Sequence, residues 1–164
     1  MRVLGIDVGF AITGWSIIDK DPMYKNGMKL VEYGAIITTA DDQFEKRLAI
    51  LHQDLDKIIK DFKPTHIAVE SLFFFKNQKT IITVAQARGV ILLTAQLNNL
   101  EIFNYTPLQV KTSITGYGRA EKAQIQKMVK MVFGLKEAPK PDDVADAIAI
   151  GYCHVNTYRI IKTI

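Results

Sequence analysis

Two short apolar segments of this chain each end in a carboxylate, and this restricts how the chain can fold. Residues 3–7 read Val-Leu-Gly-Ile-Asp and residues 67–70 read Ile-Ala-Val-Glu, so Asp7 and Glu70 follow residues typical of buried strands. A charge among apolar neighbours is costly unless another group compensates it. The fold must therefore bring a cation or hydrogen-bond donors to the ends of both strands.

The length of 164 residues predicts a single domain, residues 1–164, that buries about 70% of the surface of its unfolded chain. With 48% hydrophobic and 23% charged residues, the composition is that of a soluble globular protein. Disordered and fibrous classes are excluded on this ground.

The first part of the chain predicts an antiparallel meander of three strands. These strands are expected over residues 2–8, 12–19 and 29–37. Gly9 and Gly14 are expected to bracket the first turn, and Asn26-Gly27 marks the second.

A helix and a fourth strand are expected next. Asp41 or Asp42 can cap a helix whose apolar residues recur at spacings of three and four until Pro64. The helix forms the crossover that lets a strand at 66–70 pair in parallel with the first strand.

The second half of the chain predicts mostly helices after an irregular loop at 72–79. The helices are expected over 80–97, from Pro107, over 121–133 and over 142–158, with a fifth strand at 101–105. The chain is therefore expected to be an α/β protein with a five-stranded mixed sheet flanked by helices. The helix at 80–97 is apolar around most of its circumference, so either the same domain or a partner subunit must cover its second side.

Two further acids stand one turn apart in the last helix. Asp143 and Asp146 are neighbours on its surface, whereas Asp142 is turned about 100° from Asp143 and is expected to cap the helix. An acidic first turn also arises for purely local reasons. Together with Asp7 and Glu70, however, the pair indicates a shared site for Mg²⁺, with all four carboxylates as candidate ligands.

The charge of the chain is unevenly distributed. Net charge is +4, and residues 71–130 contain eight Lys or Arg residues against two acids. A basic region near clustered carboxylates is typical of a protein that binds a polyanion and cleaves it with a metal ion, although a solvated basic surface gives the same pattern.

The cellular setting is predicted from two further observations. Cys153 is the single cysteine and cannot form an internal disulfide, which favours a reducing cytoplasm. Polar residues interrupt the longest apolar region, residues 81–97, so no membrane association is expected.

Three adjacent aromatic residues lie in the loop after the fourth strand. Phe73, Phe74 and Phe75 cannot all face one core, so at least one is expected to stack on an unpaired base, while Lys76 and Lys79 contact phosphates. The alternative is that all three aromatics fill the core or a dimer interface.

Several motifs together resemble the RuvC family of Holliday-junction resolvases over nearly the whole chain. They are Gly5-Ile6-Asp7-x-Gly9 with Thr13-Gly14, Ala68-Val69-Glu70, Gln86-Ala87-Arg88-Gly89, Val110-Lys111, Gly116-Tyr117-Gly118, Ala120-Glu121-Lys122 and residues 142–147. The resemblance implies a ribonuclease-H-like fold. It also implies that Asp7, Glu70, Asp143 and Asp146 are the catalytic acids and hold one or two Mg²⁺ ions, for which Mn²⁺ can substitute.

The resemblance extends to substrate and partners. It implies a homodimer that resolves four-way DNA junctions by paired symmetric nicks in recombination and repair, leaving 5′-phosphate and 3′-hydroxyl ends, together with a branch-migration complex of the RuvA and RuvB type. Lys122 is expected to act in catalysis and bind DNA. Lys111, Arg119 and the loop residues Phe73, Phe74, Lys76 and Lys79 are the other expected DNA contacts.

Three other functions remain open from the residues alone. They are a ribonuclease-H-like nuclease that cleaves RNA–DNA hybrids, a junction-binding module without catalysis, and a phosphotransferase related to sugar or acetate kinases. The alternative for Lys111 and Lys122 is that they are ordinary surface lysines.

Overall fold

The first three strands form the predicted antiparallel meander. A computed structural model describes residues 1–24, 26–71 and 78–161, and it contains β1 (Arg2–Asp7), β2 (Ile12–Lys20) and β3 (Met28–Ile37). β1 pairs with β2 and β2 with β3, both antiparallel, and the register of the first pair sets Asp7 opposite Gly14.

Two parallel strands complete the sheet. β4 (His66–Glu70) lies beside β1, and β5 (Glu101–Tyr105) lies beside β4. The strand order is β3-β2-β1-β4-β5, so the predicted mixed five-stranded sheet is confirmed.

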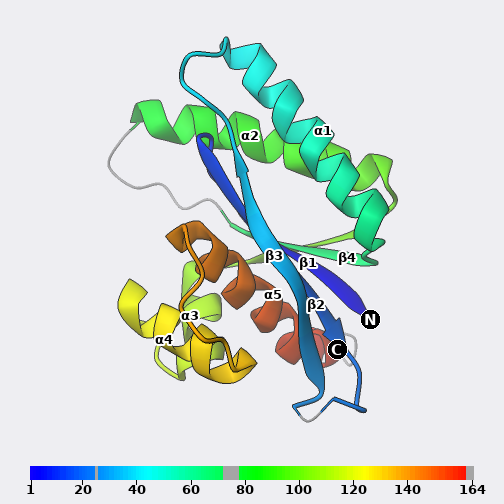
Figure 1. The fold of residues 1–164 in the computed structure, drawn as a ribbon, viewed down its shortest axis with the longest axis vertical. Coiled ribbons are helices and arrows are strands. Elements are labelled where there is room, and N and C mark those ends of the chain that lie inside the picture. The colour runs from blue at the N-terminus through cyan, green and yellow to red at the C-terminus, as the bar shows by residue number, and fades with distance from the viewer. Residues whose placement is uncertain (25, 72–77, 162–164) are drawn as a thin grey trace.

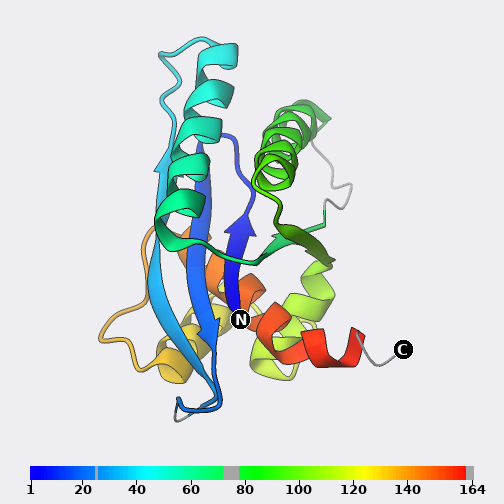
Figure 2. The same cartoon turned by 90° about the vertical axis from the view of Figure 1, so that its right-hand side faces the viewer.

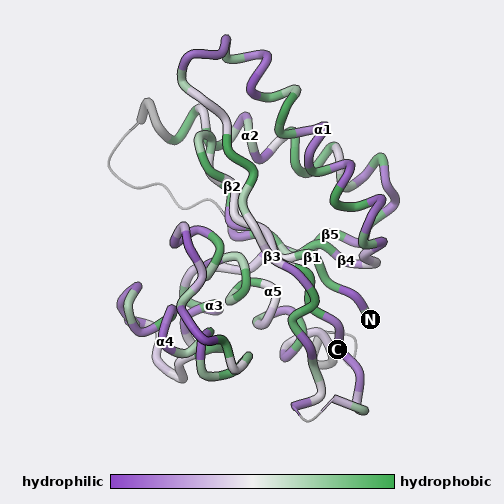
Figure 3. Tube along the Cα trace, viewed as in Figure 1, coloured by the Kyte–Doolittle hydropathy of each residue, from purple (hydrophilic) through white to green (hydrophobic). Residues whose placement is uncertain are grey.

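Helices cover both faces of the sheet. α1 (Phe44–Phe62) and α2 (Gln78–Leu97) pack together on one face, and α3 (Pro107–Thr115), α4 (Lys122–Phe133) and α5 (Asp142–Ile161) group on the other (Figure 1; Figure 2). Figure 3 shows α1 alternating between hydrophobic and hydrophilic residues, as expected for a helix that buries one side.

Each face of the sheet has its own core, because successive residues of a strand point to opposite sides. Leu4 and Ile6 of β1 pack in the cluster that contains residues of α1 and α2, whereas Val3 packs with residues of α5. β1 is therefore apolar on both faces, as a central strand requires. Cys153 belongs to the second core and is fully buried.

α5 lies unusually close to β1 and β2, and two glycines make this possible. A Cβ atom at Gly5 would lie 2.4 Å from the carbonyl oxygen of Ala147, and one at Gly14 would lie 2.0 Å from that of Asp143. The buried hydroxyl of Ser16 donates a 3.0 Å hydrogen bond to the carbonyl of Ala147. These contacts set the start of α5 against the end of β1.

Two local predictions are wrong. Gly14 does not bracket a turn but lies inside β2, where its missing side chain admits α5. Neither Asp41 nor Asp42 caps α1, because Gln43 precedes the helix and makes no side-chain cap hydrogen bond. Asp42 instead forms an ion pair with Lys46, one turn into the helix.

Within the described residues, no helix combines the length and apolar character needed to cross a membrane. Pro107 opens α3 as predicted, after Thr106 whose side chain accepts a hydrogen bond from the Gln109 backbone.

We predict that Gly14→Ala destabilises the protein by roughly 1–3 kcal/mol or more, because the new methyl group meets backbone atoms of α5 that cannot move alone. Urea unfolding measures the change. Gly34→Ala is the control: its Cβ would meet only the Trp15 side chain, at 3.0 Å, which can yield. Equal losses in the two variants would contradict the close-approach role of Gly14.

Candidate active site

Asp7 and Glu70 lie side by side at one edge of the sheet. Their strands are parallel, and the paired residues Ile6 and Val69 immediately precede them. Both carboxylates are half-buried. The sequence prediction that the two strands deliver their acids to the same place is therefore confirmed.

Three helices, α3, α4 and α5, add an acid and two lysines to this edge and enclose a cavity of about 210 Å³. The cavity is lined by Asp7, Glu70, Pro107, Val110, Lys111, Lys122, Ile125, Asp146 and Ile150. Three of the four predicted acids thus share one cavity. The fourth, Asp143, is not among the lining residues, but its backbone contacts the glycine that pairs with Asp7.

The carboxylates repel one another and resist ionisation. Burial raises the pKa of Asp7 to about 8, and the charge of Asp146 adds to this shift. Glu70 and Asp143 act in the same direction, whereas Lys122 opposes them. Burial likewise raises the pKa of Glu70 and of Asp146. A group of acids in this state gains stability from any cation that enters it.

Lys122 reaches the acids from the start of α4. Its Nζ lies 3.5 Å from Oδ2 of Asp146 and 3.5 Å from Oδ2 of Asp142. These charges raise the pKa of Lys122 against the effect of burial. The predicted place of Lys122 in the site is therefore supported by its contacts.

Asp142 has a different position from the one predicted. It is the first residue of α5 and not its cap, and its Oδ1 accepts a 2.8 Å hydrogen bond from Nε2 of Gln126. Sequence reasoning assigned no site role to Asp142 or Gln126. The sequence did contain a signal for two polar helix faces. Asp142 and Asp146 are four residues apart, as are Lys122 and Gln126, so the two members of each pair lie on one face of their helix.

Lys111 and Arg119 were predicted to contact DNA. Lys111 lines the acid cavity from α3, where its charge lowers the pKa of Glu70 against the effect of burial. Arg119 is exposed in the segment between α3 and α4. Phe73, Phe74 and Lys76 lie outside the described residues, as does the side chain of Lys79, so their roles stay predictions.

The chemistry of the acid group fits a hard divalent cation. Oxygen ligands are those that Mg²⁺ prefers, and the mutual repulsion of half-buried carboxylates is relieved by a cation among them. In the described part of the chain, no group of three or more His, Cys, Asp or Glu side chains is close enough in this conformation to hold a metal ion. To hold a cation together, three of these carboxylates would have to move closer to one another.

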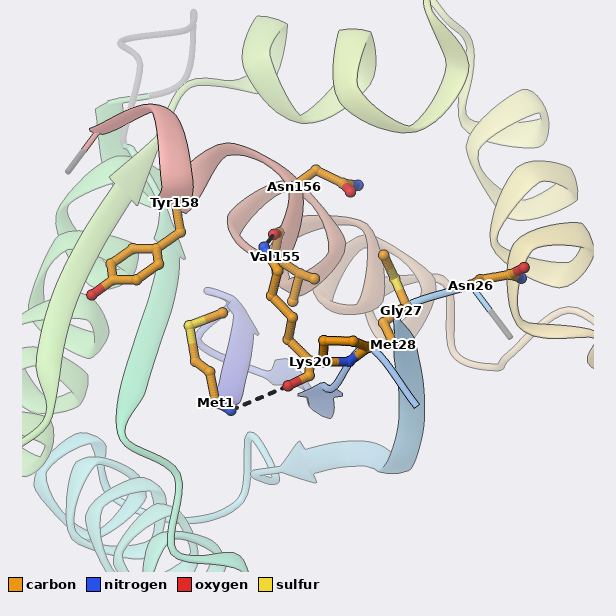
Figure 4. A pocket seen from close by; sticks show the side chains of 9 residues that line it. Met1, Lys20, Asn26, Gly27, Met28, Val155, Asn156 and Tyr158 are labelled. Atoms are coloured by element: carbon orange, nitrogen blue, oxygen red, sulfur yellow. Dashed lines mark hydrogen bonds between the residues drawn. The ribbon is translucent and has the colours of Figure 1, made fainter. Parts of the chain in front are cut away.

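A larger cavity, of about 480 Å³, lies at the other end of α5 (Figure 4). Met1, Met28, Val155 and Tyr158 contribute much of its wall, and the Met1 amino group donates a 3.2 Å hydrogen bond to the Lys20 carbonyl. None of the described residues that line it is acidic. Of these two cavities, the smaller one is therefore the one with acidic residues in its lining.

A mixed sheet in the order β3-β2-β1-β4-β5, with acids at the ends of β1 and β4 and on the last helix, defines a ribonuclease-H-like protein. The family model described as crossover junction endodeoxyribonuclease RuvC matches residues 3–154. The chain belongs to the RuvC family.

Relatives and solved structures agree with this assignment. The chain is 56% identical to crossover junction endodeoxyribonuclease RuvC of Fusobacterium nucleatum over 157 residues, which cover 96% of this chain and 81% of that protein. The RuvC of Caldicellulosiruptor saccharolyticus is also 56% identical over 157 residues, 94% of this chain and 92% of the relative. Thermus thermophilus RuvC in complex with Holliday junction substrate has a TM-score of 0.90 at 30% identity, covering 98% of this chain and 96% of that one.

We predict that the metal-free protein loses stability as the pH rises from about 4 to about 8. The pKa of Asp7 is about 8 in the folded state and near its ordinary value of 3.8 when unfolded, so the folded state holds the extra proton in this range. Urea unfolding in EDTA should show a slope of up to about 1.4 kcal/mol per pH unit. Asp7→Asn should reduce the slope and leave the contributions of Glu70 and Asp146, whose pKa burial also raises; an unchanged slope in this variant would contradict the assignment.

Proposed function

We propose that this chain is a divalent-metal-dependent endonuclease that resolves four-way DNA junctions by paired symmetric nicks. The observation that carries the proposal is the cavity that Asp7, Glu70 and Asp146 line together with two lysines. Membership of the RuvC family supplies the substrate class. The cellular role that follows is the resolution of recombination and repair intermediates.

The chemistry rests on carboxylates and lysines with separate tasks. Asp7, Glu70, Asp143 and Asp146 hold one or two Mg²⁺ ions, with Mn²⁺ as a substitute. Bound there, the metal supplies an activated water and stabilises the leaving 3′ oxygen, so that the products carry 5′-phosphate and 3′-hydroxyl ends. Lys122 stabilises charge on the phosphate from the mouth of the cavity.

The DNA backbone is bound next to the acids. Lys111 lies at the cavity and Arg119 in the exposed segment that leads to α4, so both can neutralise phosphates that flank the cut. Phe73 or Phe74, in the segment that follows Glu70, stacks on an unpaired base of the opened junction, and Lys76 and Lys79 extend the phosphate contacts.

A second copy of the chain is the proposed partner. Ile82, Leu93 and Leu97 of α2 are 61%, 58% and 65% exposed, and their spacing sets them along one side of the helix. Gly89 lies on the same side, and a Cβ atom there would meet no described atom within 4 Å. Such a surface suits close packing against the same helix of another subunit. The resulting dimer has two-fold symmetry, as a four-way junction does.

We predict that Leu93→Lys shifts the protein from dimer to monomer, because the change sets like charges together across a two-fold interface. Sedimentation velocity measures the mass. Met131→Lys, which changes a residue of α4 that is 64% exposed, should remain dimeric. A monomeric wild-type protein, or a Leu93→Lys dimer of unchanged affinity, would contradict the interface.

Two features of the cellular setting belong to the same proposal. A branch-migration complex of the RuvA and RuvB type would deliver the junction, and the cytoplasm is the compartment in which both would meet the DNA. Membership of the RuvC family is the observation that supports both.

The experiment that tests the function compares labelled four-way junction, linear duplex, RNA–DNA hybrid and ATP, each with and without Mg²⁺. We predict paired nicks in the junction alone. Asp7→Asn should bind the junction at least as well but lose nicking by a factor of 10² or more, on the order expected for a metal ligand. Cutting of the hybrid, junction binding without cleavage in the wild type, or ATP turnover would each select a different function.

A further inference from the structure

The ammonium group of Lys122 lies between two acids that have different surroundings. Its distances to the Asp142 and Asp146 carboxylates are equal, 3.5 Å each. Asp146 lines the acid cavity and its side chain is 27% exposed, whereas the side chain of Asp142 is 55% exposed and lies outside the lining. Lys122 thus contacts one acid that lines the cavity and one acid that lies outside the lining.

Asp142 is held in place independently of Lys122. The amide of Gln126 donates to its Oδ1, while Oδ2 faces Lys122, so the two oxygens have separate partners. Both partners come from one face of α4, and the acid comes from the first turn of α5. The start of one helix is therefore tied to the start of the other at the edge of the cavity.

A divalent cation and Lys122 compete for Asp146. Once a cation binds this carboxylate, its charge repels the ammonium group from the cavity. A lysine without another partner then moves into solvent, since its long side chain gains rotamer freedom there. Asp142 and Asp143 both lie outside the cavity lining and act on the charge of Lys122, and of the two it is Asp142 whose carboxylate lies 3.5 Å from the ammonium group.

We propose that Asp142 is a positioning residue that holds Lys122 at the rim of the acid cavity when a divalent cation occupies Asp146. Gln126 orients the carboxylate for this task. The consequence for the reaction is that Lys122 stays beside the incoming phosphate and does not compete for Asp146. This inference rests on the proposed metal-dependent nuclease function.

The first test is a double-mutant cycle on Mn²⁺ affinity without DNA, measured by the electron paramagnetic resonance signal of free Mn²⁺. Asp142→Asn removes the charge and leaves an oxygen for Gln126, so Lys122 pairs with Asp146 alone. Mn²⁺ affinity should fall by about threefold to fivefold, the range of one exposed ion pair. In the Lys122→Met background the same change should leave affinity nearly unaltered.

The matched control is Glu137→Gln, which removes one exposed acid between α4 and α5. Its effect on affinity measures the change in overall charge alone. Equal losses from Asp142→Asn with and without Lys122 would mean that Asp142 acts only through its charge, and would overturn the inference. If wild-type protein binds no Mn²⁺ at all, or Asp7→Asn binds it unchanged, the proposed metal site fails instead, and the inference falls with it.

The second test separates positioning from fold damage through junction cleavage. Asp142→Asn should lower kcat by a factor approaching that of Lys122→Met, with KM for the junction little changed, and Asp142→Glu should recover part of the rate. A loss confined to KM, or a loss of the same size when Lys122 is already methionine, would overturn the role assigned to Asp142.

Discussion

The structure depends on how closely α5 approaches the centre of the sheet. Gly5 and Gly14 leave no side chain between the strands and the helix, and Ser16 ties the Ala147 carbonyl to β2. The first turn of α5 therefore starts at the end of β1, where a backbone contact of this kind permits little displacement. The contact between α5 and the strands therefore positions the acids that α5 contributes.

The close approach of α5 to the sheet also brings negatively charged side chains together. Asp7, Glu70 and Asp146 share a cavity in which burial raises the pKa of each carboxyl, so the acids bind a proton or a cation more readily than a surface acid does. Lys122 supplies part of the missing charge from outside. Acids that repel one another in this way lower the stability of the fold, and a cation bound among them would restore it.

Individual residues show which structural features local sequence patterns predict and which they miss. The strands and helices follow from apolar periodicity, and Asp7 and Glu70 were placed together because parallel neighbours end at one edge. Gly14 was misplaced because a glycine inside a strand has the same local signal as one in a turn. Asp142 was taken for a helix cap, since the spacing of residues in its own segment does not show that Lys122 and Gln126 of another helix are its partners.

The sequence by itself determined the order of elements, the sheet, the acids and the family, because periodicity, turn residues and motif spacing are local properties of the chain. Only the tertiary structure decided that Asp146 lines the cavity while Asp142 stands at its rim, and that one lysine contacts both. The physical reason is that these relations depend on the packing of α4 against α5. That packing is set by contacts between distant segments, which no local pattern encodes.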